Sequence, residues 1–174
     1  MQKNTATTTV LVVIDMQTFF YNRGLRNHNV SPEQMKKDWI GAVKAIQKEI
    51  RQAKKNHDFI LIVECSGFFP GAYGQTDGRI RQTIGKYQHV RYVKKDFDDG
   101  SAEIEDMLIE TQRNSPERFR VCGINRAYCV ASTVKGLADK YVESKILLVD
   151  DAITDEHGNM GWGGATRLRN TVVV

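Results

Sequence analysis

The strongest constraint on the fold is a continuous run of apolar, mostly β-branched residues, Thr9 to Ile14 (TVLVVI), which ends at Asp15. Such a run is typical of a strand that is buried on both faces of a sheet. A second run, Phe59 to Val63 (FILIV), has the same character. Because sheets with two buried faces are covered by helices on both sides, these runs favour an α/β fold.

Helical patterns alternate with the predicted strands. From Pro32 to Asn56 apolar residues recur at helical spacing after a capping serine, Ser31. We expect further helices at about 76–84, 101–108 and 127–141, and further strands at 90–93, 119–122, 146–149 and 171–174. This alternation predicts right-handed βαβ units. We therefore predict one domain over residues 1–174, a three-layer α/β/α fold with a doubly wound, mostly parallel six-stranded sheet.

Composition and charge limit the partners that we expect. The 174 residues are 41% apolar and 26% charged, as in a globular protein, and the net charge is +4. The basic residues occur as scattered pairs at 36–37, 54–55 and 94–95, without interleaved aromatics, so we expect no nucleic-acid partner. The apolar runs are far shorter than the ~20 residues of a membrane span, so we expect no membrane association.

Cysteine and histidine usage argues against a structural metal. The three cysteines, Cys65, Cys122 and Cys129, are an odd number without a secretory signal, which is typical of free thiols in the cytoplasm. There is no Cys-x-x-Cys pair, and the four histidines have no metal-ligand spacing. We therefore expect neither a metal nor another cofactor.

In a sheet of this kind the functional site lies at the carboxyl ends of the strands. No glycine-rich phosphate-binding motif follows the first strand, which counts against a nucleotide-binding domain. Instead Asp15 ends the first strand, Lys94 ends the third, and Cys129 opens the helix after the fourth. Each residue has a structural alternative: a turn aspartate, a solvated lysine and an inert buried thiol. Cys129 lies near a helix N-terminus, which lowers the pKa of a thiol and can hold an oxyanion.

Four segments resemble the isochorismatase-like cysteine hydrolases, a family that includes nicotinamidases and N-carbamoyl amidases. LVVIDMQTFF (residues 11–20) resembles the first-strand signature, and VCGINRAYCVASTVKGLADKY (121–141) resembles the nucleophile segment. YVKKDFDDG (92–100) and LLVDDA (147–152) are similar to the lysine segment and to the fifth strand. The segments follow one another in the family's order over most of the chain.

The resemblance implies a catalytic triad of Asp15, Lys94 and Cys129. We choose Lys94 over Lys95 because the family lysine directly ends its strand and stands three residues before an aromatic, here Phe97. The implied reaction is hydrolysis of a C–N bond in a small amide or ureide, without a metal, through a thioester on the cysteine. The family also implies a homo-oligomer. The alternatives are a non-catalytic binding or assembly module on the same fold, or an isochorismatase- or nicotinamidase-type activity.

Further site residues follow from the same resemblance. It implies a cis peptide between Ile124 and Asn125, with the N–H groups of Asn125 and Cys129 forming an oxyanion hole. Phe20 is expected to wall the pocket; Phe68 and Phe69 could do so but are better explained as core. Arg126 stands where the family has threonine, and it could bind a substrate carboxylate or point to solvent or a neighbouring subunit.

Two departures from the family bear on the substrate. The stretch after the second strand, residues 63–68, contains no histidine, so the metal ligands of nicotinamidases are missing. The lysine segment continues as Asp98-Asp99-Gly100-Ser101, where the family has a small residue followed by Phe-x-x-Thr. We therefore expect a substrate that differs from those of named relatives. With Arg126 as a possible carboxylate ligand, we expect it to carry an acidic or polar substituent.

Overall fold

Six strands form one parallel sheet in the computed structural model, which describes residues 8–67, 73–113, 115–158 and 161–174. The strand order is β3-β2-β1-β4-β5-β6. The strands are β1 (Thr9–Ile14), β2 (Phe59–Cys65), β3 (Val90–Lys95), β4 (Arg118–Ile124), β5 (Lys145–Thr154) and β6 (Thr171–Val173). The predicted doubly wound α/β fold is thereby confirmed.

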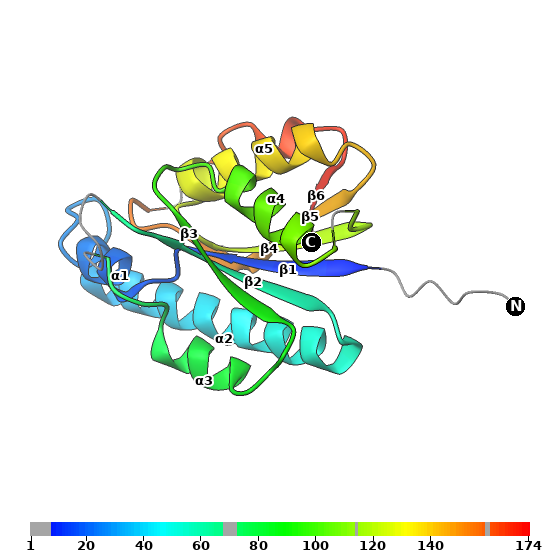
Figure 1. Ribbon diagram of the computed structural model, residues 1–174. Coiled ribbons are helices and arrows are strands. Elements are labelled where there is room, and N and C mark those ends of the chain that lie inside the picture. Colours follow the sequence, from blue (N-terminus) through cyan, green and yellow to red (C-terminus); the bar gives the residue numbers. More distant parts are fainter. Residues whose placement is uncertain (1–7, 68–72, 114, 159–160) are drawn as a thin grey trace, which may run out of the picture.

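Helices cover both faces of the sheet (Figure 1). The helices are α1 (Thr18–Gly24), α2 (Pro32–Asn56), α3 (Gly78–Ile84), α4 (Ser101–Glu110) and α5 (Ala131–Lys140), with a π-helical turn at Arg126–Val130 and a 3-10 turn at Ala165–Arg167. Figure 1 shows α1, α2 and α3 on one face and α4 and α5 on the other. Each face has its own apolar core, one packed mainly against α2 and the other against α4 and α5.

Side chains of successive strand residues point to opposite faces, and this assigns them to the two cores. In β1, Val10, Val12 and Ile14 belong to the core under α4 and α5, whereas Leu11 and Val13 belong to the core under α2. All six residues of β1 are buried, as the unbroken apolar run predicted.

The strand order reverses between β1 and β4, which places the topological switch point there. The chain builds β2 and β3 outward on one side of β1, then returns to add β4, β5 and β6 on the other side. Such a reversal leaves a crevice at the carboxyl ends of the two central strands. Asp15 follows β1 and Asn125 follows β4, so both lie at this crevice.

Three local features differ from the sequence-based prediction. The seven-residue helix α1 was not predicted, because it is too short to show a helical period. Strand β5 continues to Thr154 rather than ending at Val149, across an irregularity in its pairing with β4. The predicted start of the last long helix, 127–130, forms a π turn, and α5 itself begins at Ala131.

Gly123 is required where β4 approaches β1. Its φ is +149°, and a Cβ there would lie 2.4 Å from the carbonyl oxygen of Ile14. We expect Gly123→Ala to lower the free energy of unfolding by about 3 kcal/mol, because backbone atoms would have to shift. Urea unfolding measures the change. Gly41→Ala is the matched control, since a Cβ at Gly41 meets nothing within 4 Å; equal stability of the two variants would contradict the prediction.

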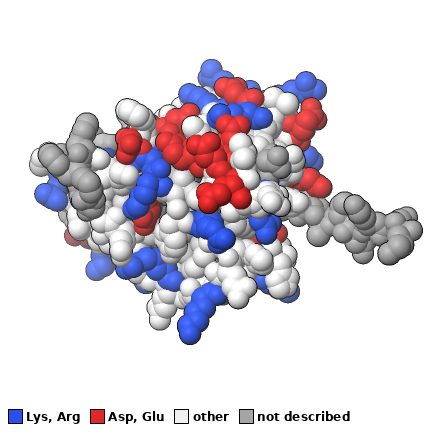
Figure 2. All heavy atoms as spheres, viewed as in Figure 1, with Lys and Arg blue, Asp and Glu red and all other residues white. Residues whose placement is uncertain are grey.

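Charged side chains are distributed unevenly on the face seen in Figure 2. Carboxylates gather on its upper part, where Figure 1 places the acidic helix α4. Lys and Arg are spread over the same face rather than gathered in one patch (Figure 2). Among the described helices, none combines the length and the hydropathy that a membrane crossing requires.

Candidate active site

A buried ion pair joins the ends of β1 and β3. Asp15 is wholly buried directly after β1 and has a φ of +55°, in the left-handed region that aspartate tolerates better than most residues. Lys95 is the last residue of β3, and its Nζ lies 2.9 Å from Asp15 Oδ2. Neither side chain is exposed. The lysine stem passes Gly100, where a Cβ would lie 2.9 Å from Lys95 Cδ, so the glycine leaves room for it.

The prediction of Lys94 as the site lysine is wrong in position, and Lys95 takes its place. Lys94 Nζ lies 2.5 Å from Glu64 Oε2, and 56% of its side chain is exposed. The reason is the alternation of the strand: Lys95 points to the same face as Val93, which packs in the core under α4 and α5. Lys94 therefore points to the opposite face, away from Cys129.

Cys129 lies in the π turn that connects β4 to α5, on the face of the sheet that Lys95 reaches. The residue is 6% exposed, and its Sγ lies 3.5 Å from Asp98 Oδ1 as a hydrogen-bond donor. The Asp15 carboxylate also lies close enough to raise the pKa of this thiol. Short π-helical turns occur frequently at functional sites. The structure thus brings Asp15 and Cys129 together as predicted, with Lys95 as the third member.

The electrostatics of the cluster differ from the predicted low-pKa thiolate. Burial raises the pKa of the Cys129 thiol, and the Asp15 carboxylate raises it further, whereas Lys95 lowers it. Burial also raises the pKa of Asp15, although Lys95 opposes this. The thiol of Cys129 is therefore neutral, and it lies beside the Asp15–Lys95 ion pair, in which Asp15 is the group that could take a proton from it.

Alkylation tests this arrangement. We expect iodoacetamide to react with Cys129 with a pH midpoint above the ~8.5 of a free thiol, because the folded environment disfavours the thiolate. Cys122 is fully buried in β4 and should react only on unfolding. Timed alkylation across the alkaline range, followed by peptide mass spectrometry, gives the midpoint for each thiol. A midpoint below that of free cysteine would show that the folded protein favours the thiolate, and would contradict this arrangement of charges around Cys129.

The cluster opens on a cavity of about 660 Å³. Residues from several separate segments line it: Phe20, Arg23, Cys65, Tyr73, Asp96, Phe97, Asp98, Asp99, Asn125, Tyr128, Cys129, Ser132 and His157. Phe20 lines the cavity as predicted, while Phe68 and Phe69 lie outside the described residues. Phe97, which is 78% exposed, also lines this cavity.

Asn125 follows directly after β4, without the implied cis peptide. Every peptide bond between described residues is trans, so the expectation for Ile124 and Asn125 is wrong. Asn125 instead makes the turn by adopting a φ of +66°, which asparagine tolerates. Its carbonyl accepts the N–H groups of Tyr128 and Val130. Asn125 and Cys129 both line the cavity, and their role as an oxyanion hole stays a prediction.

Arg126 lies at a different cavity, so the proposed contact with a substrate carboxylate is wrong in position. Its guanidinium is 3.2 Å from Asp150 Oδ1 and 3.1 Å from the carbonyl oxygen of Ile153. It also stacks over Trp162, 4.5 Å from the ring centre. These contacts hold Arg126 against β5 and away from Cys129. The expectation of an acidic substituent on the substrate loses its support.

Several residues at the site carried no signal that identified them in the sequence. Arg23 forms an ion pair with the buried Glu156 and lies over the ring of Phe20. Gln17 links the loops: its amide nitrogen donates to the carbonyl of Cys65 and its oxygen accepts the Cys65 N–H. Their partners are 48 to 133 residues away along the chain, so only the fold reveals the pairing.

No metal site was found among the residues that the structure describes. They contain no group of three or more histidine, cysteine, aspartate or glutamate side chains that could hold an ion. Glu64, the penultimate residue of β2, is instead bound by Thr76, whose N–H and hydroxyl both donate to it, and by Lys94.

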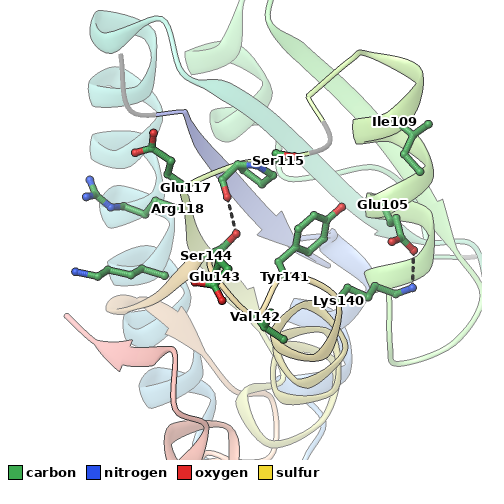
Figure 3. A pocket seen from close by; sticks show the side chains of 12 residues that line it. Glu105, Ile109, Ser115, Glu117, Arg118, Lys140, Tyr141, Val142, Glu143 and Ser144 are labelled. Carbon is green, nitrogen blue, oxygen red and sulfur yellow. Dashed lines mark hydrogen bonds and ion pairs between the residues drawn. The ribbon is translucent and has the colours of Figure 1, made fainter. Parts of the chain in front are cut away.

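A second cavity, of about 770 Å³, lies at the opposite edge of the sheet (Figure 3). It is bordered by the N-terminal ends of β4 and β5 and by the end of α5. Lys140, one of its two lining lysines, pairs with Glu105 across the gap between α5 and α4 (Figure 3). Its lining includes no thiol, so we place the chemistry at the smaller cavity beside Cys129.

Comparisons with known proteins agree with the fold. No protein-family model matches the sequence, and no curated protein matches it. Among solved structures, N-carbamoylsarcosine amidase from Thermoplasma acidophilum has a TM-score of 0.70 at 17% identity, covering 95% of both chains. Pyrazinamidase/nicotinamidase from Streptococcus mutans has a TM-score of 0.68 at 16% identity, covering 96% of this chain and all of its own. MAR1 ribonuclease from Caenorhabditis elegans has a TM-score of 0.69 at 15% identity, covering 94% and 72%.

The amidase and the nicotinamidase are representatives of the family whose segments the sequence resembles. Their likeness to this chain confirms the predicted fold. One fold can host many activities, so the activity has to be argued from the site itself.

Proposed function

We propose that this protein hydrolyses a C–N bond of a small amide or ureide, with Cys129 as nucleophile, Asp15 as general base and Lys95 as the cation that holds both. The observation that carries the proposal is the position of Cys129 between a fully buried Asp15–Lys95 ion pair and an open cavity. Nucleophile, base and orienting group in mutual contact are the arrangement required for covalent catalysis.

The proposed reaction begins with proton transfer from the Cys129 thiol to the Asp15 carboxylate. The thiolate attacks the carbonyl carbon, and the resulting oxyanion is held by backbone N–H groups, for which Asn125 and Cys129 are the candidates. The C–N bond breaks, and the amine takes the proton from Asp15 as it leaves. Water then loses a proton to Asp15 and attacks the thioester, which releases the acid and restores the thiol.

Lys95 keeps its proton throughout the proposed cycle. The negative charge of Asp15, and that of Cys129 once ionised, raise the pKa of its ammonium group, although burial opposes this. A fixed cation at this position compensates the charge that develops on sulfur during attack, in a site from which water is excluded.

The test is ammonia release from a panel of small amides and ureides, combined with trapping of the intermediate. A substrate should release ammonia at a rate that saturates, and rapid acid quenching should leave its acyl group on the Cys129 peptide. Absence of turnover across the panel would favour the alternative of a non-catalytic module. Single-stranded RNA is tested alongside the panel, with strand cleavage as the readout, because one structural neighbour is titled a ribonuclease.

The remaining expectations about surroundings stay predictions: a homo-oligomer in the cytoplasm, with no nucleic-acid or membrane partner. Size-exclusion chromatography with light scattering would give the oligomeric state.

A further inference from the structure

The cavity beside Cys129 is lined by more negative than positive charge. Asp96, Asp98 and Asp99 belong to its lining, and within the described part of the chain none of them forms an ion pair. The one guanidinium in the lining, Arg23, is paired with the buried Glu156. Beneath the thiol, the charges of Asp15 and Lys95 compensate each other.

The Asp98 carboxylate lies within hydrogen-bonding distance of the Cys129 sulfur. Its Oδ1 accepts the Cys129 thiol at 3.5 Å. The main chain holds it in place, because the Asp98 carbonyl accepts Lys95 Nζ at 3.2 Å and the Thr133 hydroxyl at 3.3 Å. Asp98 also falls in the segment where this sequence departs from the family pattern. A substrate bound for attack by Cys129 has to lie against this carboxylate.

A second acceptor lies at the same cavity. Asn125 is 3% exposed and lines the cavity, and its side-chain oxygen has no hydrogen-bond partner among the described residues. A buried amide oxygen without a donor is unfavourable, so a ligand that donates to it would be favoured. Asp98 and Asn125 thus both present oxygen atoms that require a donor or a cation from the ligand.

We propose that the substrate carries a positive charge, as an ammonium, amidinium or guanidinium group, and that Asp98 selects it. This inference rests on the proposed function, whose site it specifies. Carboxylate oxygens bind such groups through charge-assisted hydrogen bonds. Phe97 and Tyr128 line the same cavity, and aromatic rings attract cations. An acidic substrate would instead be repelled by three unpaired carboxylates.

The charge of the substrate would also act on the nucleophile. The Asp98 carboxylate is among the groups that raise the pKa of the Cys129 thiol. A cation bound to Asp98 compensates this charge and makes the thiolate easier to form once substrate is present. Asp98→Asn removes the same charge permanently, so it should speed alkylation of Cys129 by iodoacetamide, a neutral reagent, at pH 8.

Three amides of matched length provide the test: γ-aminobutyramide, valeramide and glutaramate, whose far ends are an ammonium, a methyl and a carboxylate. We expect kcat/KM to be at least about tenfold higher for γ-aminobutyramide than for valeramide, and lowest for glutaramate. Asp98→Asn should remove most of that preference. Asp106→Asn makes the same change of net charge on the exposed face of α4 and should leave the preference intact.

Binding to the Cys129→Ala protein separates this inference from the proposed function. Calorimetry with the same three amides should give the same order, and the order should disappear when Asp98→Asn is added. If the wild-type protein hydrolyses neither these amides nor any amide or ureide of the wider panel, but the binding order holds, the proposed function falls and the cation site stands. If hydrolysis requires Cys129 but valeramide or glutaramate equals γ-aminobutyramide, or if γ-aminobutyramide shows no measurable binding, the inference is overturned.

Discussion

The Cys129→Ala protein is expected to lose amide hydrolysis by a factor on the order of 10⁴ or more while remaining folded. The sulfur forms the covalent intermediate, so no neighbouring group can replace it; Asp15 could at best direct a water molecule at the substrate. The variant should remain folded, because replacing a thiol by hydrogen is a small change at a core residue that also borders the cavity. Ammonia release under saturating substrate, compared with the thermal unfolding midpoint of the same preparation, measures both effects.

Cys122→Ala is the matched control for this experiment. Cys122 is fully buried in β4, and its side chain packs in the core under α2, on the opposite face of the sheet from Cys129. Its removal should lower stability through a small cavity and leave turnover unchanged below the unfolding temperature. If the Cys129 variant kept more than about one-tenth of wild-type turnover, its loss would be far smaller than the loss of a covalent nucleophile causes. Cys129 would then not be the nucleophile.

The sheet could be predicted from the sequence because both of its faces are buried. Burial on two sides demands unbroken apolar runs, and those of β1 and β2 leave little room for another interpretation. The edge strand β3 is different: Arg91, Tyr92 and Lys94 are exposed, so the run is short and its ends are poorly defined. That is where the prediction of the site lysine failed.

The choice between the two lysines depends on which face of the sheet carries Cys129. Adjacent strand residues point to opposite faces, so Lys94 and Lys95 cannot share a role. The spacing of residues in the sequence does not reveal which of the two lysines points toward Cys129. That depends on the face of the sheet on which α5 packs, and α5 is not directly connected to β3. Burial of Val93 on the α5 side is the signal that settles it, and it becomes visible only in the tertiary structure.

Arg126 was misplaced for a related reason. A regular helix from residue 127 would present side chains at fixed angular steps, but residues 126–130 form a π turn with one extra residue. Sequence offers no reliable signal for such a turn. In the folded chain the turn leaves Cys129 facing the cavity and Arg126 facing Asp150.

Lys95→Met is expected to lower the free energy of unfolding by about 3–5 kcal/mol at pH 7.5, because it leaves the buried Asp15 carboxylate without its cation. Burial already raises the pKa of Asp15, and loss of Lys95 would raise it further. A carboxyl group whose pKa is higher in the folded than in the unfolded state favours folding only at acidic pH. The variant should therefore recover stability as the pH falls and Asp15 becomes protonated. Urea unfolding at pH 7.5 and pH 5 measures both effects.

Lys94→Met is the matched control, one residue away and with the same change of charge. Lys94 is more than half exposed, and Glu64 keeps its two hydrogen bonds from Thr76, so the loss should be about 1 kcal/mol or less. Its turnover should persist, whereas that of Lys95→Met should collapse even where the protein is folded. The double variant Asp15→Asn/Lys95→Met should regain much of the lost stability without regaining activity. A larger loss of turnover from Lys94→Met than from Lys95→Met would assign the catalytic role to the exposed lysine and remove the buried pair from the mechanism.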